Sequence, residues 1–211
     1  MDEILAKAIV DLQVPFFGKS LKNKGDSRSC LFRARRLLSS PKILKHAGKR
    51  IARIVSTQCE AKTLMGVVSS GLPWAAAASI YSGLPMMYVR KKLELHMSNQ
   101  MIEGIEPKIK KVIMIDDLMF AGESKNEFLE ILAKEGYQVT DIIVVIDRQL
   151  QRKKDGLAIQ DKWHLKLHRL ITMDEIVNYM EERQLISKEQ LSNLIKDYRK
   201  FERWDMPSFA K

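Results

Sequence analysis

Hydrophobic positions along the chain fall into two kinds of pattern. Short continuous runs that are rich in β-branched side chains indicate buried strands, because they are too short for helices. Apolar residues spaced three or four positions apart indicate amphipathic helices that cover a sheet. We expect strands at about 29–36, 63–68, 85–89, 112–115, 139–146 and 163–170, and helices at about 2–12, 40–55, 74–81, 124–135, 173–182 and after 187.

Residues at the element ends support these boundaries. Ser40 followed by Pro41 supplies an N-cap and a first helical residue. Thr172 is expected to cap a later helix, and Ser187 with Gln190 forms the pattern of a capping box. Because strands alternate with helices through the middle of the chain, the pattern predicts an α/β fold with a mostly parallel central sheet flanked by helices.

The chain contains no internal repeat, low-complexity segment or linker. We therefore expect a single domain over residues 1–211. Polar loops are expected at 98–107 and 150–161. The domain is divided into a small N-terminal hood, a core and a C-terminal helical part, at about 1–36, 40–170 and 171–205.

An acidic pair follows the apolar run at 112–115. Asp116 and Asp117 end this run, and a loop containing Gly122 leads into the next helix. Ligands of open α/β sheets bind outside the carboxyl ends of strands, and a helix N-terminus favours phosphate. Carboxylates at such a place suit sugar hydroxyls, or a hard cation that holds a diphosphate. A solvated acidic pair that caps the helix is the alternative, and this stretch alone leaves both interpretations open.

Polar groups also follow the other expected strands. They are expected to meet at one edge of the sheet, because the carboxyl ends of parallel strands converge there. The groups are Ser69 and Ser70, Arg90 and Lys91, and Asp147 and Arg148.

Composition limits the class of protein. With 45% apolar and 29% charged residues, the chain is typical of a soluble globular protein, and no apolar run is long enough to cross a membrane. The start of the sequence lacks the apolar core of a secretory signal. The two cysteines, Cys30 and Cys59, form no disulfide framework, so a reduced cytoplasmic protein is expected. The four histidines are not spaced with the cysteines as a ligand set, so no structural zinc site is predicted and Cys59 is assigned to packing.

The net charge of +10 is concentrated near the N-terminus. Residues 1–62 hold 14 Lys and Arg against 5 Asp and Glu, a net charge of +9. This charge suits anionic small ligands and permits nucleic-acid contact. We interpret the basic face of the helix at 40–55 as a solvated outer face, so nucleic-acid binding is not favoured.

Six blocks of sequence resemble the orotate phosphoribosyltransferases in order and spacing, from about residue 20 to the C-terminal helices. The blocks are LKNKGDSRSCLF, RRLLSSPKIL, GVVSSGLPWA, VRKKLELHMSNQMIEG, VIMIDDLMFAGES and VVIDRQ. The resemblance implies a type I phosphoribosyltransferase fold and transfer of a phosphoribosyl group from phosphoribosyl pyrophosphate to orotate, a step of pyrimidine biosynthesis. It also implies Mg²⁺, bound through the substrate with no direct protein ligand, and a homodimer.

The resemblance further implies a role for individual residues. Asp116 and Asp117 would hold the ribose hydroxyls, and Lys91 and His96, with Arg90, would neutralise pyrophosphate. Backbone groups of the loop would wrap the 5′-phosphate; this loop comprises Leu118, Met119, Phe120, Ala121, Gly122, Glu123 and Ser124.

The base and the pyrophosphate would contact residues from four other blocks. Arg148 would grip the orotate carboxylate, and Phe32 would pack on the base. Lys22 would lie near both substrates, with Lys24 as a competing assignment, and Ser69 and Ser70 would meet pyrophosphate. The alternatives are that Phe32 is a core residue and that Arg148 is an ion-pair partner of Asp147.

The sequence departs from the family pattern at five positions. They are Ala34, Ser69, Glu94, Phe120 and Glu123, where the family commonly has an aspartate, a tyrosine, a lysine, a hydroxyl residue and no acid. Three hypotheses remain: an orotate enzyme, a transferase for another base, and an impaired paralog that acts as a regulator or binds RNA. We favour the orotate enzyme, because the acidic pair and Arg148 are retained.

Overall fold

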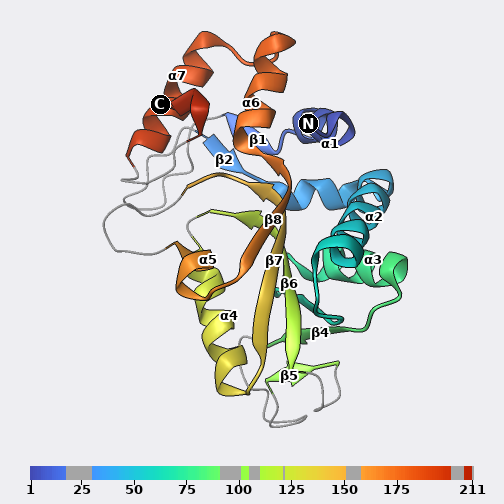
Figure 1. The fold of residues 1–211 in the computed structure, drawn as a ribbon. Helices are drawn as coiled ribbons and strands as arrows, with labels where there is room; N and C mark the ends of the chain where they lie inside the picture. The colour runs from blue at the N-terminus through green and yellow to red at the C-terminus, as the bar shows by residue number, and fades with distance from the viewer. Residues whose placement is uncertain are drawn as a thin grey trace.

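The central element of the fold is a six-stranded sheet with strand order β5-β4-β3-β6-β7-β8 (Figure 1). The computed structural model describes residues 1–17, 30–90, 101–104, 110–120, 122–150, 158–200 and 207–210, without the side chains of 123 and 124. The strands are parallel except β5, which pairs antiparallel with β4. Their bounds are β3 Leu64–Gly66, β4 Met86–Val89, β5 Ile102–Glu103, β6 Lys111–Met119, β7 Gln138–Asp147 and β8 Lys166–Thr172.

Helices cover both faces of the sheet (Figure 1). One face packs on α2 (Pro41–Gln58) and α3 (Leu72–Ser82), and the other on α4 (Glu123–Lys134) and α5 (Ile159–Lys162). Successive side chains of a strand point to opposite faces. Ile113 and Ile115 of β6 accordingly join the core under α2 and α3, and Val112 and Met114 join the core under α4. A strand buried on both faces explains the continuous apolar run in the sequence.

The two ends of the chain lie together beyond the carboxyl ends of β7 and β8 (Figure 1). The N-terminal part contains α1 (Glu3–Asp11) and a small antiparallel sheet of β1 (Pro15–Phe17) and β2 (Cys30–Phe32), followed by a 3-10 helix (Ala34–Ser39). The C-terminal part consists of α6 (Met173–Glu182), α7 (Lys188–Arg199) and a short 3-10 helix (Ser208–Ala210). Leu5, Ile9, Ile176 and Tyr198 belong to one buried cluster, so the two parts share a core.

The expected α/β architecture with a mostly parallel sheet is confirmed, and the expected helix starts hold in detail. Ser40 accepts a hydrogen bond from the backbone N–H of Ile43. Thr172 caps α6 in a capping box with Glu175, and Ser187 caps α7 in the same way with Gln190. None of the described helices combines the length and the apolar character needed to cross a membrane.

Four local predictions were wrong. The strand expected at 29–36 is β2 followed by the 3-10 helix, and the expected loop at 98–107 contains β5. The expected loop at 150–161 contains the start of α5. The strand expected to end before the acidic pair instead continues through it to Met119, because β6 keeps its pairing with β7 as far as Asp147.

Candidate active site

The acidic pair lies inside the sheet rather than in the loop after it. Asp116 and Asp117 belong to β6 and are only 4% and 8% exposed. Two buried neighbouring carboxylates need compensating partners, because burial disfavours charge. A solvated acidic pair, which the sequence left as an alternative, is therefore wrong.

Asp116 has partners from three directions. The Lys125 Nζ atom on α4 lies 2.7 Å from Asp116 Oδ2. The Ser70 hydroxyl and the backbone N–H of Asp117 both donate to Asp116 Oδ1, each at 2.8 Å. These contacts hold the Asp116 carboxylate in one orientation beside Asp117.

The environment of Asp117 favours its protonated form. Burial, and then the negative charge of Asp116, raise the pKa of Asp117 from its ordinary value of 3.8 to about 6, and the nearby Lys125 ammonium partly opposes this rise. Asp117 therefore changes its charge just below neutral pH.

Lys125 also closes the loop between β6 and α4. Its Nζ atom donates to the carbonyl oxygen of Leu118 at 2.7 Å, and its side chain is 3% exposed. Gly122, at the N-cap of α4, has a φ of 79°, a conformation that favours glycine. A Cβ atom there would also lie 3.1 Å from Ile159. A lysine in the first turn of a helix faces the positive end of the helix dipole, and the ion pair with Asp116 offsets this cost.

The loop after β3 brings Ser70 to the acidic pair. The backbone N–H of Val67 donates to Ile115 O at 3.0 Å, and the N–H of Gly71 donates to Val67 O at 2.7 Å. A Cβ atom on Gly71 would lie 2.1 Å from Ile115 O, so only glycine allows this close approach of the two backbones. The peptide bond between Val68 and Ser69 is cis.

Arg148 lies in a cage of aromatic rings at the carboxyl end of β7. Its guanidinium carbon is 4.3, 4.5 and 5.2 Å from the ring centroids of Phe32, Phe120 and Tyr198. Its Nε atom donates to the Tyr198 hydroxyl at 3.3 Å, and the residue is 5% exposed. Cation–π contacts of this kind hold a guanidinium in a fixed plane.

No carboxylate of the described residues lies within ion-pair distance of Arg148. Asp147, the expected alternative partner, instead pairs with Arg169, whose Nε atom lies 3.5 Å from Asp147 Oδ2. A buried cation with aromatic neighbours and no anion is costly unless a ligand supplies the charge.

Comparison with known proteins identifies the family. A model of the phosphoribosyl transferase domain matches residues 34–170. The orotate phosphoribosyltransferase of Listeria monocytogenes (serovar 1/2a) is 30% identical over 168 residues, which cover 79% of each chain. The chain belongs to the phosphoribosyltransferase family.

Solved structures agree with this assignment. The orotate phosphoribosyltransferase of Aeropyrum pernix is 26% identical, with a TM-score of 0.66, and the match covers 87% of this chain and 99% of that one. The UMP synthase of Leishmania donovani is 25% identical, with a TM-score of 0.78 over 94% of this chain. This phosphoribosyltransferase spans only 42% of that longer protein.

The predicted site residues of this phosphoribosyltransferase fall into three groups. Asp116, Asp117 and Ser70 lie together, while Ser69 in the same loop is exposed. Arg148 lies with Phe32 and Phe120. Arg90, after β4, is held by Glu103, with its Nη2 atom 3.0 Å from Glu103 Oε1.

Leu118 is half-buried and Met119 is buried. Lys22, Lys24, Lys91, Glu94, His96 and Ala121 lie outside the described residues, as do the side chains of Glu123 and Ser124.

Sequence reasoning missed two residues of this phosphoribosyltransferase site. Lys125 was overlooked. A lysine in the first turn of a helix is repelled by the positive end of the helix dipole, so its position just after an acidic pair indicates that a carboxylate compensates its charge. Tyr198 comes from α7, and nothing in its local sequence connects it with Arg148. Phe120 was treated as the loss of a hydroxyl, whereas the structure makes it one wall of the arginine cage.

Proposed function

We propose that this chain transfers the phosphoribosyl group from phosphoribosyl pyrophosphate to orotate, giving orotidine monophosphate and pyrophosphate. The observation that carries the proposal is Arg148, a buried guanidinium in an aromatic cage with no carboxylate partner among the described residues. Orotate is a planar ring that bears a carboxylate. It supplies the missing anion for a bidentate contact and a flat face that Phe32 or Phe120 can pack against.

The acidic pair suits the sugar part of the reaction. The ribose gains positive character as the bond to pyrophosphate breaks, and a fixed anion nearby stabilises that charge. Asp116 is held by Lys125 and Ser70, so it needs no reorganisation during the reaction. Asp117, with its pKa of about 6, is ionised at neutral pH and holds the ribose hydroxyls.

The phosphate groups are assigned to backbone amides and to cations. The loop from Leu118 to Ser124 ends at the N-terminus of α4, where free N–H groups favour the 5′-phosphate. Arg90, Lys91 and His96 neutralise pyrophosphate, with Lys22, Ser69 and Ser70 as further contacts. Binding of pyrophosphate by Arg90 competes with its ion pair to Glu103.

Mg²⁺ fits this site as a cation carried by the substrate. Both carboxylate oxygens of Asp116 already have partners, so the donor set does not form a dedicated protein cage for the ion. The diphosphate would carry the ion, and Asp117 would be the neighbouring carboxylate. When bound, the ion would supply positive charge against the leaving pyrophosphate.

The direct test is the loss of orotate absorbance after the purified protein is mixed with orotate, phosphoribosyl pyrophosphate and Mg²⁺. We expect a decrease that requires all three components and that is absent for Asp117→Asn. Uracil, which lacks the carboxylate, should be a poor substrate because it leaves Arg148 unpaired. No reaction with orotate, together with no calorimetric signal for phosphoribosyl pyrophosphate and Mg²⁺, would reject the proposal.

We also propose a homodimer in which the segment that contains Lys91 and His96 serves the neighbouring subunit. The exposed apolar side chains Ile80 and Tyr81 of α3, 79% and 40% exposed, are consistent with a contact surface between subunits. Mixing inactive Asp117→Asn with inactive Lys91→Ala tests this arrangement, because mixed dimers regain one complete site. Recovery of about a quarter of the activity is the binomial expectation for random mixing, and no recovery contradicts shared sites.

A regulatory or RNA-binding function has less support. Two basic residues of α2, His46 and Arg50, also contact Asp2, so part of the basic face is paired within the protein. No described feature favours this alternative over the enzyme.

A further inference from the structure

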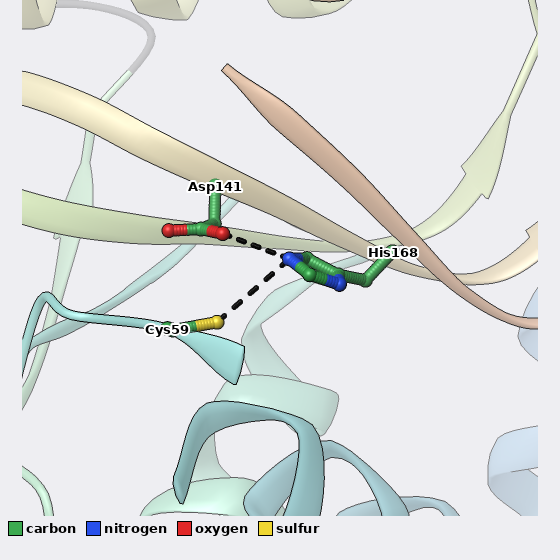
Figure 2. A group of neighbouring side chains, drawn as sticks. All are labelled: Cys59, Asp141 and His168. Atoms are coloured by element: carbon green, nitrogen blue, oxygen red, sulfur yellow. Dashed lines mark hydrogen bonds and ion pairs between the residues drawn. The ribbon is translucent and has the colours of Figure 1, made fainter. Parts of the chain in front are cut away.

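A second cluster of chemically active side chains lies far from the acidic pair. Cys59 follows the end of α2, Asp141 lies near the start of β7, and His168 lies near the start of β8 (Figure 2). Asp116, Asp117 and Arg148 occupy the carboxyl ends of their strands, so the two sites lie toward opposite ends of the sheet. The donor atoms of the cluster all lie within 4.8 Å of one another.

Sheet register explains how the cluster forms. Ile143 of β7 pairs with His168 of β8, so Asp141 and His168 are diagonal neighbours on the same sheet face. That face packs against α2, whose end delivers Cys59. Cys59 and His168 are 109 positions apart in the sequence, which is why spacing alone predicted no ligand set.

Both contacts of His168 use the same ring nitrogen. Its Nε2 atom lies 2.8 Å from Asp141 Oδ1 and 3.9 Å from Cys59 Sγ, and Figure 2 shows both side chains directed at this atom. A catalytic Cys-His-Asp relay uses one ring nitrogen for the thiol and the other for the carboxylate. The three donor atoms instead surround one small region, as the ligand atoms of an ion do.

The state of Cys59 also argues against a nucleophile. A reactive cysteine requires access to solvent, whereas Cys59 is only 7% exposed.

We propose that Cys59, Asp141 and His168 bind a divalent transition-metal ion of the zinc class. A thiolate, an imidazole nitrogen and a carboxylate oxygen form a ligand set that zinc accepts, with water in the fourth position of a tetrahedron. The Thr140 hydroxyl donates to Asp141 Oδ2 at 2.8 Å and leaves Oδ1 directed at His168, as an orienting partner of a metal ligand does.

The ion joins three separate elements. It connects the end of α2 to the first residues of β7 and β8, on the sheet face that carries the larger core cluster. Its role is therefore to stabilise the fold, because it lies away from the substrate groups of the proposed reaction. This proposal does not depend on the identity of the base.

The test uses the full chain after removal of metal by a chelator. Titration with Co²⁺ should give a thiolate-to-cobalt charge-transfer band that saturates at one ion per chain, and Zn²⁺ should abolish the band by displacement. Zn²⁺ should also raise the melting temperature. Absence of both the band and the temperature shift overturns the proposal.

Variants assign the ligands. Cys59→Ser and His168→Gln should lose the band and weaken zinc binding by more than roughly 100-fold, and Thr140→Val by about tenfold, because removing an outer partner costs less than removing a ligand. His164→Gln is the matched control, because His164 is an exposed histidine just before the same strand, and it should bind zinc as the original protein does. Unchanged zinc affinity in Cys59→Ser contradicts the site.

A further variant keeps the test decisive if Cys59→Ser does not fold. The chain has only two cysteines, so Cys30→Ser leaves Cys59 as the one available thiol. We expect Cys30→Ser to retain the charge-transfer band at full intensity. Loss of the band in this variant would place the metal at Cys30 and refute the assignment.

Discussion

A charged side chain is buried at the carboxyl end of both β6 and β7, but the two charges differ in whether the protein supplies a counter-charge. At the end of β6, Asp116 has a lysine, a hydroxyl and a backbone N–H as partners within the protein. At the end of β7, Arg148 has aromatic rings and a tyrosine hydroxyl, with no carboxylate among the described residues. Asp116 is therefore compensated within the protein before any ligand arrives, whereas Arg148 obtains its counter-charge from the ligand.

This difference indicates two separate roles: Asp116 is preorganised to stabilise charge during the reaction, and Arg148 recognises the anionic ligand. A compensated anion can stabilise developing positive charge without rearrangement. An uncompensated buried cation destabilises the free protein, and this destabilisation is offset when an anion binds. Loss of Arg148 should therefore leave stability intact, whereas loss of Lys125, the partner of Asp116, should lower it.

The largest effect on recognition of orotate is expected for Arg148→Met. The orotate carboxylate would lose its partner, and kcat/KM for orotate should fall by about 10³-fold or more, roughly 4 kcal/mol. Removing the unpaired charge should leave the free energy of unfolding unchanged or raise it by about 1 kcal/mol. Steady-state kinetics and urea unfolding measure the two quantities.

Arg169→Met is the matched control for Arg148→Met. This arginine lies on the neighbouring strand and is paired with Asp147, so its loss should lower stability by up to about 1 kcal/mol and have little effect on KM for orotate. Equal effects of the two substitutions on kcat/KM would remove the special role of Arg148.

Lys125→Met should be the most destabilising change at the end of β6. It leaves Asp116 buried beside Asp117 without its cation, and we expect a loss of about 3 kcal/mol in the free energy of unfolding at neutral pH. The pKa of Asp117 should rise further, because Lys125 now lowers it. Activity should therefore shift to higher pH.

Urea unfolding and a pH–rate profile measure these effects of Lys125→Met. Lys134→Met, at the exposed C-terminal end of α4, should change neither quantity appreciably. A stable Lys125→Met protein with an unshifted profile would show that the acidic pair does not depend on this lysine.

Asp117→Asn should separate stability from activity. Because the pKa of Asp117 is about 6 in the folded protein against 3.8 ordinarily, the folded state binds more protons between these values. The original protein therefore loses stability as pH rises from about 4 to 6, by about 2–3 kcal/mol, and keeps this deficit at neutral pH.

In Asp117→Asn, an uncharged amide replaces the carboxylate and removes this deficit above pH 6, while turnover is abolished. Guanidinium unfolding at pH 4 and pH 8 measures the expected gain at the higher pH alone. An equal effect at both pH values would mean that protonation of Asp117 is not its cause.

The sequence predicted the fold more completely than the site. Apolar runs and capping residues such as Ser40 and Thr172 are local signals, and they located nearly every main helix and strand of the described chain. The position of the acidic pair near the carboxyl end of β6 also followed from its place after an apolar run. Where β6 ends did not, because the strand length depends on pairing with β7.

The site residues that could not be predicted from the sequence contact residues from other elements of the fold. Lys125 and Tyr198 acquire their roles only when α4 and α7 pack against the strands, and no periodicity reports such contacts. Cys59 was assigned to packing for the same reason, because only the packing of α2 on the sheet brings it near Asp141 and His168. The roles of Lys22, Lys91 and His96 stay predictions, since these residues lie outside the described chain.

The smallest expected effect is that of Tyr198→Phe, which keeps the aromatic wall and removes the hydroxyl. The Nε atom of Arg148 would lose an acceptor at 3.3 Å, a bond to a charged group worth about 1–2 kcal/mol. KM for orotate should rise roughly five- to tenfold while kcat changes little, because the guanidinium loses orientation but keeps its charge. Tyr179→Phe, on α6, is the control and should leave KM unaltered. If Tyr198→Phe instead lowers kcat with KM unchanged, Tyr198 acts on the reacting atoms, and the division between a recognition region and a preorganised region no longer holds.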